Sequence, residues 1–205
     1  MNHASSQPVN RRAVALFVLL SVAGFFVIGQ FDLAVYHVFE GRHVGDSDLI
    51  KMFRVMGFLG TWLLAAAALA LVDGAWRRAL LLLSAPVAAG IVGEVLKQLI
   101  RRTRPMDFHG EHHSIPWSEF HWSTSHLSAP SSHAIVAFGA AWLLCRLFPR
   151  AKPVWLTLAT GCAATRVIVS AHFVSDVFLS AVAGYAVVWL IWRTRWAQAA
   201  TPAAQ

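Results

Sequence analysis

Three groups of polar residues interrupt the apolar stretches of this chain of 205 residues, and their side chains are of the types that transfer phosphoryl groups. In the first group, Lys97 and Arg104 are seven residues apart, so they share a helix face if the helix persists. Pro105 disfavours helical geometry at Arg104, so we expect the helix to end there, with both cations at the mouth of a bundle. Snorkelling of a helix-end cation toward water is the alternative for Lys97 alone.

The second group is the tetrapeptide Pro130-Ser131-Ser132-His133, which opens another apolar stretch. Serine is a preferred residue at a helix start, where free backbone N–H groups and the helix dipole suit a phosphate or another oxyanion. A plain serine cap without any ligand explains this tetrapeptide equally well when it is taken alone.

The third group contains Thr165, Arg166, His172 and Asp176. His172 and Asp176 are four residues apart and can meet on one helical face. A carboxylate that binds one imidazole nitrogen fixes the tautomer and leaves the other nitrogen free to attack. A histidine held by a carboxylate for structural reasons is the alternative for this pair by itself.

Together the three groups supply every part of a phosphoryl-transfer site. Three cations, Lys97, Arg104 and Arg166, can neutralise a phosphoryl group whose transition state carries charge on its equatorial oxygens. One oriented histidine can attack the phosphorus, and a second histidine can protonate the leaving oxygen.

These groups resemble, in order and internal spacing, the three signature motifs of the type 2 phosphatidic acid phosphatase family. The matching stretches are Lys97-x6-Arg104-Pro105, Pro130-Ser131-Ser132-His133 and Arg166-x5-His172-x3-Asp176. The resemblance implies that His172 is a nucleophile forming a phosphohistidine, that Asp176 orients it and that His133 is the general acid. It also implies a phosphate site without metal or other cofactor, made by Lys97, Arg104, Ser131, Ser132 and Arg166.

Two positions depart from the family's pattern. Ser132 stands where the family usually has glycine, and its side chain is expected to narrow the pocket or to alter how closely the backbone approaches the phosphate. Thr165 stands where the family usually has serine, and because the hydroxyl is retained we expect little consequence.

The composition predicts that membrane helices position these groups. The chain is 57% hydrophobic and 13% charged, whereas soluble domains have roughly 25% charged residues. A membrane span needs about 20 mostly apolar residues. The stretches that fit are Ala13–Phe31, Val55–Val72, Ala79–Ile100, Pro130–Phe148, Val154–Ala171 and Phe173–Trp192.

We therefore predict an all-α fold, a bundle of six transmembrane helices with the active site at the outer ends of helices three to six. Residues 13–196 form one domain between tails, 1–12 and 197–205, that are predicted to be disordered. Arg11 and Arg12 before the first stretch also fit a signal peptide, but no convincing cleavage site follows, so we expect this segment to stay as a helix. Cys145 and Cys162 lie within apolar stretches and are interpreted as packing residues.

Charge predicts the orientation of the chain in the membrane. The basic residues that fall in alternate connections are Arg11, Arg12, Arg77, Arg78, Arg146, Arg150, Lys152, Arg193 and Arg195. By the positive-inside rule these are cytoplasmic, so both termini are inside and the longest connection, 101–129, is outside. Most acids fall on that outer side: Asp32, Glu40, Asp46, Asp48, Asp107, Glu111 and Glu119. A bacterial inner membrane with the site facing the periplasm fits this pattern.

The net charge of +7 does not indicate a nucleic-acid partner, because no basic run alternates with polar surface. Basic loops beside anionic lipid headgroups explain it better. The outer connection also holds a histidine-rich set: His109, His112, His113, His121 and His126, with Glu111 and Glu119. This set can bind zinc, but a headgroup-facing polar lid that titrates near neutral pH is the preferred interpretation.

The predicted function is hydrolysis of a lipid phosphomonoester or diphosphate at the non-cytoplasmic face. Candidate substrates are polyprenyl diphosphate, phosphatidylglycerol phosphate, phosphatidic acid and phosphorylated lipid A. Two alternatives remain: a phosphotransferase between lipids, and a non-catalytic protein that binds or transports phospholipids. A binding protein needs the cations but does not need His133 or the pair formed by His172 and Asp176. The oligomeric state is left open.

Overall fold

Helices form the framework of the chain in the computed structural model, which describes residues 10–42, 47–74, 76–119 and 122–200. The helices in chain order are α1 (Arg11–Gly29), α2 (Asp32–Phe39), α3 (Asp48–Arg54), α4 (Leu59–Asp73), α5 (Trp76–Ile100), α6 (Ser132–Leu147), α7 (Lys152–Ile168), α8 (Val174–Trp192) and α9 (Arg195–Ala200). Short 3-10 turns are η1 (Val55–Gly57), η2 (Pro105–Asp107) and η3 (Pro149–Ala151). The described residues contain no strand, only two isolated bridges in the long connection, so the predicted all-α class is confirmed.

Six of these helices coincide with the six predicted apolar stretches to within a few residues. Of the described helices, α1, α5 and α8 are each long and apolar enough to cross a membrane. α3 and α4 meet the same requirement as a pair that is bent by 67° at η1, and α6 is apolar but has only 16 residues. Three or four spans therefore follow from length and composition, and the number six stays a prediction.

The structure adds short helices in segments that the sequence pattern assigns to connections or tails. α2 and α3 are much shorter than a membrane span, so the lengths of the apolar stretches do not predict them. Helices this short form because tertiary packing stabilises them. α9 begins in the predicted domain and extends into the tail predicted to be disordered from residue 197, where Ala197 is fully buried and packs in one cluster with Leu81, Leu143 and Val188. Asp46, His121 and the predicted tail segments 1–9 and 201–205 lie outside the described residues.

α6 is the central helix and packs against α5, α7 and α8. Small residues bring these helices close together, as is common in membrane bundles. A Cβ atom placed on Gly139 of α6 would lie 2.7 Å from the Cβ of Ala89 on α5. One placed on Gly184 of α8 would lie 3.0 Å from the backbone nitrogen of Gly139. The middle of α6 is therefore in near contact with α5 and α8, the helices that carry Lys97 and Asp176.

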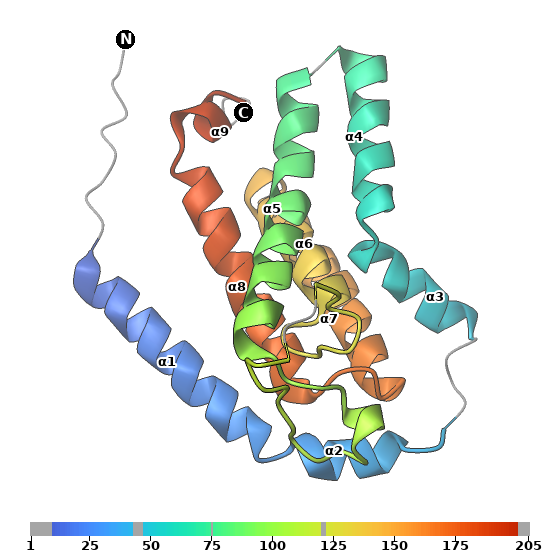
Figure 1. Cartoon of the computed structure of the whole chain (residues 1–205). Helices are drawn as coiled ribbons and strands as arrows, with labels where there is room; N and C mark the ends of the chain where they lie inside the picture. Colours follow the sequence, from blue (N-terminus) through green and yellow to red (C-terminus); the bar gives the residue numbers. More distant parts are fainter. Residues whose placement is uncertain (1–9, 43–46, 75, 120–121, 201–205) are drawn as a thin grey trace.

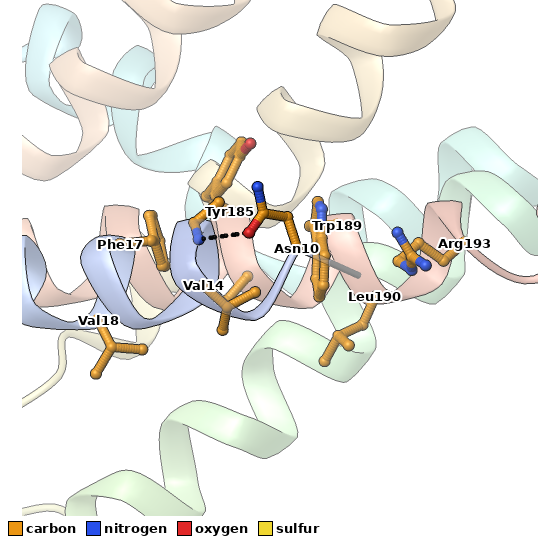
Figure 2. A pocket seen from close by; sticks show the side chains of 10 residues that line it. Asn10, Val14, Phe17, Val18, Tyr185, Trp189, Leu190 and Arg193 are labelled. Carbon is orange, nitrogen blue, oxygen red and sulfur yellow. Dashed lines mark hydrogen bonds between the residues drawn. The ribbon is translucent and has the colours of Figure 1, made fainter. Parts of the chain in front are cut away.

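The two ends of the bundle differ in what they contain (Figure 1). α2, the connection 101–131 and the first turns of α6 and α8 lie at one end, and the α4–α5 junction and α9 lie at the other. A cavity of about 410 Å³ lies between the start of α1 and the end of α8. Figure 2 shows its lining, which includes Asn10, Phe17, Trp189 and Arg193. Because α8 begins at the motif end, this cavity belongs to the opposite end and is separate from the site described below.

The predicted orientation can be tested with single cysteines in a chain whose Cys145 and Cys162 are replaced by alanine. His113 is exposed in the long connection, so His113→Cys is expected to react with an impermeant thiol reagent in intact cells. Arg150→Cys, at the other end of the bundle, is the matched control and should react only after permeabilisation. The reverse pattern of labelling would show that the chain is inverted.

Candidate active site

The first motif lies at the end of α5 and in the segment after it. α5 ends at Ile100, and Arg101 takes a left-handed conformation with φ of 56°. Arg104 has extended backbone angles, φ −77° and ψ 150°, as expected for a residue before proline. The helix therefore does not persist to Arg104, so the condition under which Lys97 and Arg104 would share a helix face is not met. Lys97 reaches the site from the last turn of α5, whereas Arg104 reaches it from a non-helical segment.

Ser132 holds the Lys97 ammonium group. Lys97 Nζ lies 2.5 Å from Ser132 Oγ and 3.5 Å from Glu94 Oε1, and Ser132 Oγ donates to the same Glu94 oxygen at 2.7 Å. Thr124 Oγ1 donates to the other Glu94 oxygen at 2.5 Å. The side chain that replaces the usual glycine thus fixes a cation of the proposed phosphate site. Thr165 donates its hydroxyl hydrogen to the Cys162 carbonyl at 2.7 Å, within its own helix.

Ser131 caps α6 and is fully buried. Its hydroxyl oxygen accepts a hydrogen bond from the backbone nitrogen of Ala134, and its own backbone nitrogen donates to Ser180 Oγ at 3.0 Å. Ser180 in turn donates to the backbone oxygen of Asp176 at 2.7 Å. These bonds tie the start of α6 to the first turns of α8, so the second and third motifs are fixed relative to each other.

His172 is buried just before α8, with its Nδ1 atom 2.8 Å from the carbonyl oxygen of Ser128. Because a carbonyl oxygen can only accept, Nδ1 carries the proton and Nε2 keeps its lone pair. Asp176 Oδ2 lies 3.8 Å from the same Nδ1, too far for a direct hydrogen bond. The predicted tautomer is the one that the structure supports, but the Ser128 carbonyl makes the orienting bond that the sequence pattern assigns to Asp176.

Cations surround the two histidines. Lys97 and Arg166 lie within electrostatic range of His133, and Arg104 and Arg166 lie within range of His172. Within the described part of the chain, the buried Nε atoms of Arg104 and Arg166 have no hydrogen-bond acceptor. A buried guanidinium N–H without a partner is costly, and an anion bound between these side chains would satisfy both. The structure therefore brings together the residues that the three motifs predict.

Several residues at this end of the bundle were not found by sequence reasoning. Arg54 at the end of α3 acts electrostatically on both His133 and Arg166. The break at η1 brings it there, because Gly57 packs so closely on α6 that an added Cβ would lie 2.5 Å from the His133 carbonyl oxygen. Arg102 is a second such residue, because it lies between Lys97 and Arg104 at a position that the first motif leaves unspecified. The sequence feature that could have identified Arg102 is its charge beside a membrane helix, because such a charged residue is a functional candidate by default.

The sequence of the histidine-rich connection also fits a zinc site. Among the described residues, no group of three or more His, Cys, Asp or Glu side chains converges as a metal site requires. His112 instead turns inward, where it contacts Arg102 and lies 3.2 Å from Asp32 Oδ2. His113 stacks on Phe108 with ring centroids 4.2 Å apart. In the structure, His112 and His113 thus make separate local contacts.

Comparisons with known proteins agree with this arrangement. Residues 78–200, more than half of the chain, match a family model described as the PAP2 superfamily. The fold is similar to the crystal structure of a transmembrane PAP2-type phosphatidylglycerolphosphate phosphatase from Bacillus subtilis, with a TM-score of 0.61. That comparison covers 84% of this chain and 92% of the other, and at 21% sequence identity it supports the fold alone.

Two curated relatives are also similar over part of their length. Both are named lipid A 1-phosphatase, one from Rhizobium johnstonii and one from Rhizobium etli, and each is 37% identical to this chain over 93 residues. The aligned stretch covers 44% of this chain but only 37% and 39% of the two relatives. The chain therefore matches well under half of the length of these relatives.

Proposed function

Since the chain belongs to the PAP2 superfamily, we propose that it is an integral membrane lipid phosphatase, which hydrolyses a phosphomonoester or diphosphate of a lipid. One observation carries this proposal. The buried Nε atoms of Arg104 and Arg166 lack an acceptor within the described residues, and both arginines lie within electrostatic range of His172, whose Nε2 lone pair is available. An anion site of this kind next to a nucleophilic nitrogen suits phosphoryl transfer.

In the proposed reaction, the Nε2 lone pair of His172 attacks the phosphorus atom, and the bond from phosphorus to the lipid oxygen breaks. His133 gives a proton to the departing oxygen, so the lipid leaves as an alcohol, or as a lipid phosphate when the substrate is a diphosphate. Lys97, Arg104 and Arg166 neutralise the equatorial oxygens during transfer. Neutral His133 then takes a proton from water, and the resulting hydroxide attacks the phosphohistidine and releases inorganic phosphate.

A non-catalytic phospholipid-binding protein would need only the cations. His172 donates from Nδ1 to the Ser128 carbonyl, which leaves the Nε2 lone pair available for attack, a feature that binding alone does not require. Transfer of the phosphoryl group to a lipid alcohol is the same chemistry with a different acceptor. We propose hydrolysis as the main reaction, on the non-cytoplasmic face that the charge pattern favours.

Phosphate release by the purified protein from a panel of lipids tests this function directly. The panel contains phosphorylated lipid A, phosphatidylglycerol phosphate, phosphatidic acid and a polyprenyl diphosphate. We expect release of phosphate from at least one of these lipids.

This release is expected to survive excess chelator, because Lys97, Arg104 and Arg166 can stabilise the phosphoryl charge without a divalent ion. Loss of activity with chelator and its return with zinc would show that a metal takes part. No release from any lipid would overturn the function.

A further inference from the structure

A buried ionic network lies directly behind the proposed nucleophile, and it joins Asp176 of the third motif to Arg102 and Asp32, which the motifs do not specify. Arg102 donates from Nη1 to Asp176 Oδ1 at 3.0 Å and to Ser175 Oγ at 2.7 Å. Its Nη2 donates to Asp32 Oδ2 at 2.8 Å. The side chains of Asp32 and Asp176 are fully buried, and that of Arg102 is 7% exposed. One guanidinium therefore bridges two carboxylates that come from opposite ends of the chain.

Asp32 also holds the start of α8 from outside that helix. Its Oδ1 accepts a hydrogen bond from the backbone nitrogen of Ser175 at 2.9 Å, and its Oδ2 accepts one from Ser175 Oγ at 2.5 Å. Ser175 lies in the first turn of α8, where backbone N–H groups lack partners within the helix. The carboxylate of α2 thus acts as a cap for the helix that carries Asp176.

The network controls the direction in which Asp176 points. Arg102 binds Oδ1 of Asp176, so the other oxygen, Oδ2, is turned toward the backbone nitrogen of Phe173 at 2.9 Å and toward His172 Nδ1 at 3.8 Å. The Arg102 guanidinium also lies 4.1 Å from the centre of the Phe173 ring. Without Arg102, Asp176 would keep a buried charge with one oxygen unpaired, a strongly unfavourable arrangement.

The charges of the network suit the phosphorylated state of His172. Two carboxylates and one guanidinium leave one net negative charge in a buried site beside the imidazole ring. When Nε2 bonds to phosphorus while Nδ1 keeps its proton, the ring gains a positive charge. A single negative charge at short range stabilises that ring.

We propose that Arg102 and Asp32 are positioning residues, which hold Asp176 beside His172 and stabilise the phosphohistidine ring through one net negative charge. This inference rests on the proposed function. His112 covers the network from the long connection, in contact with Arg102 and edge-on to Phe173 at 4.7 Å. Burial lowers the pKa of His112 and Arg102 lowers it further, so the ring is neutral at pH 7 and accepts a hydrogen bond from the guanidinium.

The test compares Arg102→Gln, Arg102→Lys and Asp32→Asn in phosphate-release kinetics with the lipid that the wild type hydrolyses. Because these residues are placed behind the nucleophile, we expect kcat to fall and KM to stay nearly unchanged. Misplacement of a reacting group by about 1 Å can cost on the order of 10²-fold, and we expect a loss of that size for Arg102→Gln. Arg102→Lys restores the charge without the planar fork and should recover part of kcat. Asp32→Asn keeps the shape of the side chain, so it tests the charge in a folded protein.

Arg101→Gln is the matched control, because Arg101 is the neighbouring buried arginine and its Nε and Nη2 donate to the carbonyls of Ile115 and Glu119. Arg101→Gln should lower thermal stability in detergent, but it should not lower kcat at nearly constant KM as the Arg102 and Asp32 variants do. An active wild type whose Arg102→Gln and Asp32→Asn variants keep kcat would overturn this inference and leave the proposed function standing. An equal loss of kcat in Arg101→Gln would also overturn it. A wild type that hydrolyses no lipid phosphate would overturn both.

Discussion

Replacement of His172 by alanine is expected to abolish phosphate release while the protein still folds and enters the membrane. In this variant no nitrogen can attack the phosphorus, and removal of a nucleophile from a set of residues that act as a unit costs roughly 10⁶-fold in kcat. The structural cost is smaller, because within the described part of the chain the imidazole makes one hydrogen bond, to the Ser128 carbonyl. The loss of a buried partner of that kind costs about 1–3 kcal/mol.

The measurement is phosphate release by purified protein, with elution volume and thermal unfolding in detergent as checks of folding. His126→Ala is the matched control, because His126 is exposed on the long connection and lies outside the proposed site. It should keep wild-type activity. Substantial turnover by a folded His172→Ala variant would reject His172 as the nucleophile, and with it the phosphohistidine intermediate.

The second large effect is expected for His133→Ala, and it distinguishes a residue that donates a proton from one that binds the phosphate. If His133 protonates the departing oxygen, His133→Ala should lose about 10²–10⁴-fold in kcat on an alkyl lipid phosphate. The loss should be much smaller on an activated aryl phosphate, whose leaving oxygen needs no proton. Arg104→Ala and Arg166→Ala remove charge stabilisation of the phosphoryl group itself, so both substrates should suffer to a similar degree.

Vanadate, which mimics the phosphoryl transition state, gives an independent measure for the same variants. Its affinity should fall strongly in Arg104→Ala and Arg166→Ala, whose buried Nε atoms lack acceptors among the described residues, and less in His133→Ala. Equal slowing of both substrates by His133→Ala would mean that His133 shapes the phosphate site. The proton donor would then be sought among the histidines of the long connection.

The helices that carry the motifs could be predicted closely because apolar stretches and helix-start residues are local signals. The predicted stretch that opens at Pro130 becomes α6 from Ser132, and the one that opens at Phe173 becomes α8 from Val174. The resemblance of the three motifs to the type 2 phosphatidic acid phosphatase family is confirmed by the family match over residues 78–200. Signals within one helix or one short motif were therefore sufficient for the framework and for the motif residues.

The remaining contacts could not be predicted because they join distant or backbone groups. His172 Nδ1 donates to the backbone carbonyl of Ser128. Because every residue has a backbone carbonyl, no residue type in the sequence identifies this acceptor. Arg102 and Asp32 are 70 positions apart, and helical periodicity says nothing about pairs at that separation. α5 ends four residues before Arg104 because the segment after it pairs with the long connection, in bridges from Arg102 to Ser114 and from Thr103 to Leu127. This tertiary pairing ends the helix earlier than the local effect of Pro105 would.

The contact between Asp32 and Ser175 spans 143 positions, and this separation sets an order of assembly during synthesis. Asp32 is made with the first helices, but its partners Arg102 and Ser175 follow only with the third and the last of the predicted spans. The full set of hydrogen bonds that Asp32 makes with Arg102 and Ser175 can therefore form only after the last of these helices has been made. A chain shortened to residues 78–200 would keep all three motifs and lose Asp32. The first turn of α8 would then keep the hydrogen bond from the Phe173 nitrogen to Asp176 but lose the Asp32 carboxylate, and Arg102 would lack one of its two carboxylates.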